Sequence, residues 1–131
     1  MMNKYGMRKT LDLPFEEALE KITGLLKEQG FGVLTKIDMQ ATLKEKLGVD
    51  IRRYVILGAC NPNLAQQALR EELEIGLLLP CNVIVYETDD HRSTVSAVDP
   101  RMMMSVTDNE ALDPVAKDAG ERLKAAVNGL N

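Results

Sequence analysis

Residues that usually carry catalysis or bind metals are scarce in this chain. Its 131 residues include one His, two Cys and no Trp. The cysteines do not form a CxxC pair, which excludes a thioredoxin-like redox motif and the usual zinc ribbon. Phosphate loops, dinucleotide fingerprints, HExxH zinc motifs and GxSxG nucleophile elbows are missing as well. The sequence therefore favours a non-catalytic protein without settling whether it is an enzyme, and we expect no cofactor and no bound metal.

Clustered positive charge and long hydrophobic runs are lacking too. Sixteen basic and twenty acidic residues give a net charge of −4, whereas nucleic acids and anionic lipids attract basic patches. Apolar runs such as 54–60 and 76–81 are too short to span a bilayer. The N-terminus also has no apolar segment of the kind found in signal peptides. We expect a cytoplasmic protein that binds neither nucleic acid nor membrane.

The remaining composition is that of a globular protein. Hydrophobic residues make up 45% of the chain and charged residues 27%, which excludes intrinsic disorder. A chain of this length can bury a sizeable core without disulfides or metals. We predict a single domain over residues 1–131.

Apolar residues at three- and four-residue spacing predict helices at about 14–29, 62–73 and 113–128. Each begins near a proline, which suits the first helical position. Asn61 and Asp113 are expected to cap the second and third helices, and Gly30 is expected to end the first. The inward face of the second helix is predicted to contain Leu64, Ala65, Ala68, Leu69 and Leu73. A shorter helix is expected through residue 47, with Asp38 as its cap and Gly48 as its end.

β-branched and apolar segments predict strands at 3–11, 31–37, 51–59, 82–87 and 93–98. The run 54–57 is continuously apolar, so its strand is expected to be central and covered on both faces. A short polar turn at 88–92 joins the last two strands into an antiparallel hairpin. The three methionines at 102–104 are expected in an irregular or strand-like stretch.

This order of elements predicts a two-layer α+β domain, with helices on one face of a mostly antiparallel sheet. The opposite sheet face is then bare, although its strands contain Val and Ile. Such a face is commonly covered by a ligand or by a second chain. We expect a homodimer, because isologous dimers are the commonest closed assembly.

Cys60 and Cys81 are the residues most open to a chemical role. Cys60 stands where a strand runs into a helix, and the helix dipole there favours a thiolate. A free cysteine is nevertheless more often a small buried side chain that fills space. We expect Cys60 to shape a pocket rather than to act as a nucleophile. Whether Cys81 lies close to it depends on strand pairing, which the sequence leaves open.

Metal sites are less favoured than packing. Zinc would have at most Cys60, Cys81 and His91 as nitrogen or sulfur ligands, which is fewer than a structural site uses. Thioether ligands for Cu(I) could come from the methionines at 102–104. Consecutive side chains in an extended segment alternate, so all three cannot face one ion.

Several segments resemble a known family. These are GACNPNLA (58–65), LLLPCNVIVYE (77–87) and Val98-Asp99-Pro100 followed by Met102. They are similar to the family catalogued as domain of unknown function 302. The resemblance implies a small α+β domain like the β-α-β4-α arrangement of the TATA-binding protein, found mostly in bacteria and archaea and often homodimeric. It implies no established activity, and it draws attention to Cys60, Asn61, Pro62, Cys81 and Asp99.

Two hypotheses of function follow. The first is a non-catalytic module that binds a small-molecule ligand or another protein, with a pocket near Cys60, Asn61, Pro62, Cys81, Asp99 and Met102. The second is a thiol-dependent redox or metal-handling protein that uses Cys60 and Cys81. We favour the first, because no general base, metal-ligand set or nucleophile elbow is visible in the sequence.

Overall fold

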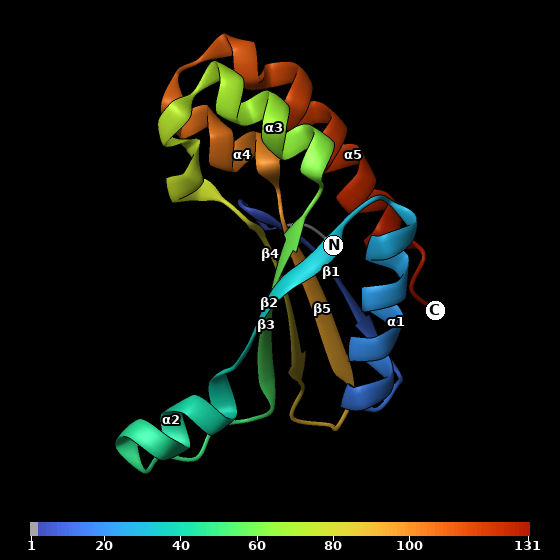
Figure 1. Ribbon diagram of the computed structural model, residues 1–131. Coiled ribbons are helices and arrows are strands. Elements are labelled where there is room, and N and C mark those ends of the chain that lie inside the picture. Colours follow the sequence, from blue (N-terminus) through green and yellow to red (C-terminus); the bar gives the residue numbers. More distant parts are fainter. Residues whose placement is uncertain (1–2) are drawn as a thin grey trace.

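The computed structural model, which describes residues 3–131, contains one five-stranded antiparallel sheet (Figure 1). Its strands are β1 (Gly6–Leu11), β2 (Gly32–Asp38), β3 (Tyr54–Cys60), β4 (Cys81–Glu87) and β5 (Ser93–Val98). Their order across the sheet is β1-β5-β4-β3-β2. The predicted hairpin is formed by β4 and β5, which pair from Val83 with Ala97 to Glu87 with Ser93.

Helices cover one face of this sheet and leave the other face open. The long helices α1 (Phe15–Glu28) and α5 (Asp113–Asn128) pack on β1, β4 and β5. At one end of the sheet lie α3 (Pro62–Glu71), the 3-10 segment η1 (Leu73–Leu78) and α4 (Pro100–Met104). Two further 3-10 turns, η2 (Ser105–Thr107) and η3 (Glu110–Leu112), lead into α5. The predicted two-layer α+β fold is confirmed, with α2, α3 and α4 inserted into the β-α-β4-α order.

The core lies between the sheet and the two long helices. Alternate strand residues turn toward the helices, so Val83, Val85 and Val95 are fully buried. Ile22 and Leu26 of α1 and Leu123 of α5 meet them, also without solvent exposure. The apolar spacing that predicted the helices thus marks the side chains that hold the two layers together.

The strand predicted at 51–59 is internal to the sheet, between β4 and β2, but the prediction that both of its faces are covered is wrong. The buried face of β3 consists of Val55, Leu57 and Ala59, while Tyr54 and Ile56 are only half-buried on the open face. A continuous apolar run therefore marks here a strand with one covered face and one apolar, uncovered face.

Two helical predictions need correction. The helix predicted over 62–73 ends at Glu71, and Leu69 and Leu73 are exposed instead of facing inward, Leu73 by 84%. The stretch at 102–104 is helical, because Asp99 accepts a hydrogen bond from the backbone N–H of Arg101 and Pro100 begins α4. Asp113 is the first residue of α5 rather than its cap.

The short helix predicted after Asp38 is present as α2 (Met39–Leu47). Asp38 caps it by accepting from the N–H of Ala41 at 2.9 Å, and Gly48 ends it in a left-handed conformation, with φ of 69°. This helix projects from the ends of β2 and β3, and none of its residues is buried. We call residues 39–49 the arm.

Helices able to cross a membrane are absent from the part of the chain that the structure describes, since none there is both long and apolar enough.

The close packing around Gly58 of β3 can be tested by substitution. A Cβ at this position would clash with Oγ1 of Thr35 and would lie 2.8 Å from Cγ of Pro80. Gly58→Ala should therefore lower the free energy of unfolding by about 1–3 kcal/mol, the usual cost of overpacking. Chemical denaturation measures the change. Gly32→Ala is the matched control, because no atom lies within 4 Å of its added Cβ. Equal losses in the two variants would contradict this packing.

Candidate ligand-binding site

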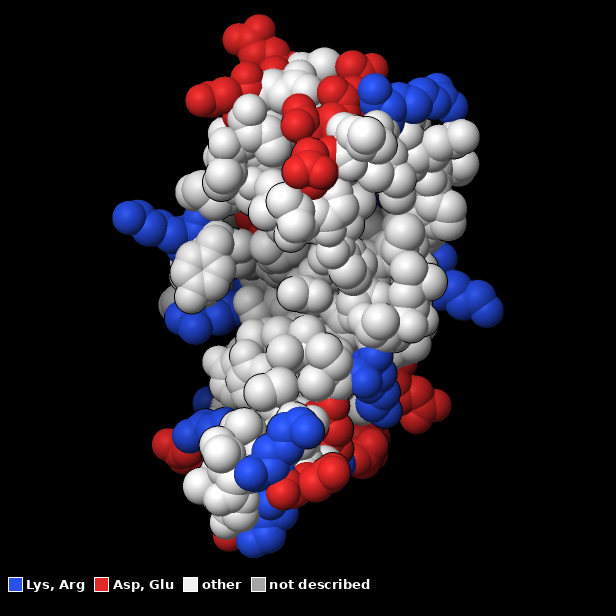
Figure 2. All heavy atoms as spheres, turned by 60° about the vertical axis from the view of Figure 1, so that its left-hand side comes forward, with Lys and Arg blue, Asp and Glu red and all other residues white. Residues whose placement is uncertain are grey.

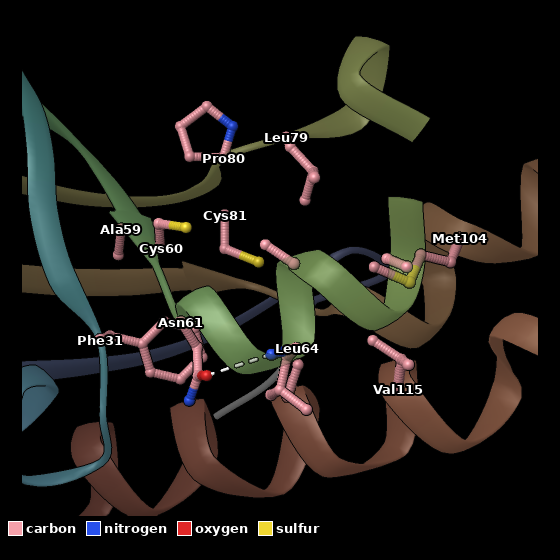
Figure 3. Close-up of a pocket in the computed structure, with 13 residues that line it drawn as sticks. Phe31, Ala59, Cys60, Asn61, Leu64, Leu79, Pro80, Cys81, Met104 and Val115 are labelled. Carbon is pink, nitrogen blue, oxygen red and sulfur yellow. Dashed lines mark hydrogen bonds between the residues drawn. The ribbon is translucent and has the colours of Figure 1, made fainter. Parts of the chain in front are cut away.

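The candidate site lies where β3 ends and β4 begins. Ala59 pairs with Cys81 across these antiparallel strands, so Cys60 and Cys81 lie at the same end of the sheet. This pairing answers the question that the sequence left open. Both residues are free thiols, Cys60 half-buried and Cys81 buried. In Figure 3 their sulfur atoms point in the same direction, into the space between Leu79 and α3.

Asn61 fixes the direction of α3 immediately after Cys60. Its side-chain Oδ1 accepts a hydrogen bond from the N–H of Leu64 at 3.2 Å, and Pro62 occupies the first helical position. The predicted cap is confirmed. It satisfies one of the N–H groups left unpaired at the start of a helix. As a result, Leu64 and Ala68 face the core from α3.

The end of α1 supplies another wall of the site. The N–H of Gly30 donates to the carbonyl of Lys27 and that of Phe31 to the carbonyl of Leu26, which is a Schellman motif. Gly30 has a φ of 83°, and a Cβ on it would lie 2.9 Å from Nδ2 of Asn61. Glycine is therefore required both by the turn and by the packing of Asn61. The motif directs the chain so that Phe31 is buried beside Asn61 (Figure 3).

Between these elements is an apolar crevice, which we call the slot. The space between its walls is about 330 Å³ including its open mouth, and the centre of a water molecule could occupy about 20 Å³ of it. That is room for one small group rather than for a whole drug-sized molecule. Its lining residues are Phe31, Ala59, Cys60, Asn61, Leu64, Ala65, Ala68, Leu79, Pro80, Cys81, Met104, Val115 and Ala119.

The slot runs from the surface into the core. Its half-buried residues, Cys60, Ala65, Leu79 and Pro80, form the mouth, and the buried ones form the floor. Within residues 3–131, every buried side-chain nitrogen or oxygen has a hydrogen-bond partner. No polar side chain is therefore left unpaired toward the slot, and its chemistry is that of an apolar surface.

The environment of Cys81 disfavours its thiolate. Burial raises the pKa of the Cys81 thiol to about 11, and the nearby Cys60 adds to this rise. A thiol attacks electrophiles and binds metals only after it loses its proton. Cys81 is thus held in the neutral form that suits an apolar wall.

Three of the other expected site residues lie outside the slot. Asp99 caps α4, and Met102 is exposed on that helix. Pro62 lies on the outer side of α3, in a separate polar groove that it shares with Asn63, Gln66, Gln67, Arg70 and Arg122. Asn61 and Leu64 belong to both the groove and the slot, so the two are adjacent.

Other slot residues were not predicted as site residues. Met104 was considered only as a copper ligand, but its buried side chain belongs to the floor of the slot. Phe31 could have been found from Gly30, since a residue after a Schellman glycine often packs against the helix. Ala59, Ala65, Ala68 and Ala119 carry no such signal, because a small side chain is compatible with any buried contact.

The three residues considered as zinc ligands, Cys60, Cys81 and His91, do not lie together in the structure. His91 is in the β4–β5 turn, and β4 begins at Cys81. The length of this strand separates His91 from the cysteines by about 20 Å, at the usual rise per residue. Across residues 3–131 no group of three or more His, Cys, Asp and Glu side chains is placed to hold a metal ion.

Comparisons with known proteins agree with this fold. The family model described as "Domain of unknown function DUF302" matches residues 7–130. A solved structure described as "Crystal structure of uncharacterized conserved protein DUF302 from Bacillus stearothermophilus" superimposes with a TM-score of 0.89. It has 31% sequence identity, and the match covers 96% of this chain and 98% of that one. No curated protein matches the chain. On this evidence the protein belongs to the DUF302 family.

Proposed function

We propose that this protein is a non-catalytic binding module whose slot receives a small apolar group of a ligand. The observation that carries the proposal is a crevice open to the surface at Cys60, Ala65, Leu79 and Pro80 and continuing into an otherwise closely packed core. Protein interiors normally fill such space with side chains. Here four alanines line it instead, at positions 59, 65, 68 and 119.

The size of the slot indicates what part of a ligand it takes. A methyl or ethyl group suits a space of this size. Burying each CH₂ contributes about 0.8 kcal/mol, so the slot alone supports only weak binding. The rest of the ligand must therefore make contacts elsewhere. The adjacent groove with Gln66, Gln67 and Arg70 offers polar contacts, which favours a ligand with one apolar and one polar end.

A thiol-dependent redox or metal-handling role is the second candidate. It is supported by one observation, namely that Cys60 and Cys81 line the same slot. The raised pKa of Cys81 opposes it, because the neutral thiol is a poor nucleophile and a poor metal ligand. We therefore place both sulfurs in the wall of an apolar binding site.

Closing the mouth should abolish binding. Ala65→Leu adds an isobutyl side chain at the half-buried rim, where it can enter the slot. In methyl NMR spectra, 1-butanol and hexanoate should shift the signals of Leu64 and Val115 in the unmodified protein and not in this variant. Ala125→Leu is the matched control, because Ala125 is an exposed α5 residue outside the slot lining. Equal shifts in all three proteins, or no shifts in any, would exclude the slot as the binding site.

Burial should slow the reaction of Cys81 with alkylating reagents. In the unmodified protein, with the two cysteines distinguished by peptide mass, alkylation of Cys81 by iodoacetamide at pH 8 should be about a hundredfold slower than in the unfolded chain. The reason is that a pKa raised from 9.0 to about 11 lowers the thiolate fraction by that factor. Timed labelling with mass spectrometry gives both rates. Labelling of native Cys81 as fast as in urea would instead support thiol chemistry.

The same pKa gives a pH dependence of stability. Because the folded-state pKa is raised, the Cys81 contribution is complete below about pH 9 and is lost as the pH rises toward 11. The free energy of unfolding should fall more steeply over this window in the unmodified protein than in Cys81→Ala. Urea titrations at several pH values provide the comparison. Parallel pH profiles for the two proteins would mean that burial does not hold Cys81 neutral.

A further inference from the structure

The polar groove beside α3 is large enough for a whole small molecule. It is lined by the outer side of α3, by Gly30 after α1, and by Asp118 and Arg122 of α5. About 810 Å³ of it is open to the centres of water molecules, compared with about 20 Å³ in the slot. The slot receives one small group, whereas the groove can hold an entire small ligand.

Asn61 brings an unused hydrogen-bond donor to the groove. Its side chain is nine-tenths buried, with 9% of the residue exposed. Oδ1 accepts from the N–H of Leu64, which fixes the orientation of the amide, and in Figure 3 Nδ2 points away from the two cysteines. Nδ2 donates to no atom of residues 3–131. Because the slot has no polar surface, this NH₂ group meets solvent in the groove, which Asn61 also lines.

Arg122 brings further donors to the same place. Its Nε donates to Oδ1 of Asp118 at 2.9 Å, and its Nη1 donates to the carbonyl of Gln29 at 3.3 Å. These two bonds hold the guanidinium in place and leave its other N–H groups available. A Cβ on Gly30 would lie 2.9 Å from Nδ2 of Asn61 and 4.0 Å from Nη1 of Arg122. The two nitrogens are therefore close enough for one carboxylate to contact both.

A third donor comes from the backbone at the start of α3. The first N–H groups of a helix have no partner within the helix. Here Pro62 has no N–H, and the N–H of Leu64 is capped by Asn61. The N–H of Asn63 donates to no atom of the described chain, and Asn63 lines the groove. The positive end of the helix dipole lies at this point as well.

The acceptors at this end of the groove are already engaged. Oδ1 of Asn61 binds the N–H of Leu64, and the carboxylate of Asp118 is paired with Arg122. The groups that are held in place thus leave N–H donors over, so a ligand that satisfies them must bring acceptor oxygens. Hydrogen bonds to an ionised oxygen are about twice as strong as those between neutral groups. The arrangement therefore favours an anion.

The charge of the groove favours a carboxylate over a phosphate. Its lining has two arginines, Arg70 and Arg122, against one acid, Asp118, which leaves a net charge of +1. Arg70 has no ion pair or hydrogen bond within residues 3–131. A carboxylate matches one positive charge, whereas a phosphate group has a charge of about −1.5 to −2. The open face of the sheet offers no comparable attraction, because its centre is nearly free of charged side chains (Figure 2).

We propose that the groove binds the carboxylate of a small organic acid between Asn61, Asn63 and Arg122. The carboxylate oxygens accept from Nδ2 of Asn61, from the backbone N–H of Asn63 and from the guanidinium of Arg122. The proposal deepens the proposed function by naming the polar end of the ligand, and in that respect it rests on that function. Carboxylate binding itself needs only the groove and does not require the slot to be open.

Formate separates the groove from the slot, because it has a carboxylate and no alkyl group. In nitrogen–proton correlation NMR spectra at constant ionic strength, formate should shift the Nδ2 signals of Asn61 and the Nε signal of Arg122. The shifts should saturate in the millimolar range, as expected for a few charge-assisted hydrogen bonds open to water. Formamide, a neutral molecule of similar shape, should leave these signals in place. Phosphate should bind more weakly than formate. Equal shifts with formamide, or tighter binding of phosphate, would overturn the assignment to a carboxylate.

Asn61→Asp is the decisive variant. It keeps an oxygen to cap α3, since Asp and Asn cap helices about equally well, but it replaces the donating NH₂ group with a second carboxylate oxygen. The dissociation constant of formate should rise by at least about tenfold, because like charges then face each other. The temperature of thermal unfolding should stay close to that of the unmodified protein, because the cap is retained.

Three further variants serve as controls. Arg70→Gln should weaken formate binding by no more than about threefold, because Arg70 lies about 13 Å along α3 from Asn61, at about 1.5 Å per residue, where salt screens its attraction. Lys124→Gln removes a charge from the exposed side of α5 outside the groove and should change nothing. Ala65→Leu should bind formate normally, so that a failure of the slot is distinguished from a failure of the groove. Shifts that do not saturate, or equal formate affinity in Asn61→Asp and the unmodified protein, would overturn the proposal.

Discussion

The pairing of β3 with β4 positions everything else at the candidate site. Its register places Ala59 opposite Cys81, and it requires glycine at position 58, where Thr35 and Pro80 approach too closely for any side chain. β3 then turns through Cys60 into the Asn61 cap, which directs α3 along the end of the sheet. Shifting this register by one residue would turn Cys81 and Val83 to the open face. The slot lies where the ends of β3 and β4, the start of α3 and the end of α1 come together.

Much of the fold could be predicted from local signals. Amphipathic spacing and a proline near each start predicted α1, α3 and α5, and the polar turn at 88–92 predicted the hairpin. The apolar run 54–57 was misleading, because an uncovered apolar face produces the same pattern as a doubly covered strand. Met102–Met104 were misjudged from their side chains alone. Asp99-Pro100, which resembles the Asn61-Pro62 signal, was the better evidence there, since Asp99 caps α4.

The candidate site was less accessible to prediction. Cys60 and Asn61 are adjacent in the chain, so their proximity needed no tertiary information, but Cys81 joins them only through the strand register. Asp99 and Met102 follow β5, and their distance from the slot depends on how α4 leaves the sheet. The alanines that create the space cannot be distinguished in the sequence from alanines that merely pack. The space in the slot depends on several residues that are far apart in the sequence, so no single position predicts it.

The central claim is that the slot is real space that an apolar guest can enter. Diffraction from crystals held under xenon pressure tests it directly, because xenon occupies dry apolar cavities without needing hydrogen bonds. We expect a xenon site between Cys60, Ala65, Leu79 and Met104, present in the unmodified protein and absent in Ala65→Leu. Side chains that fill this region and exclude xenon from the unmodified protein would contradict it.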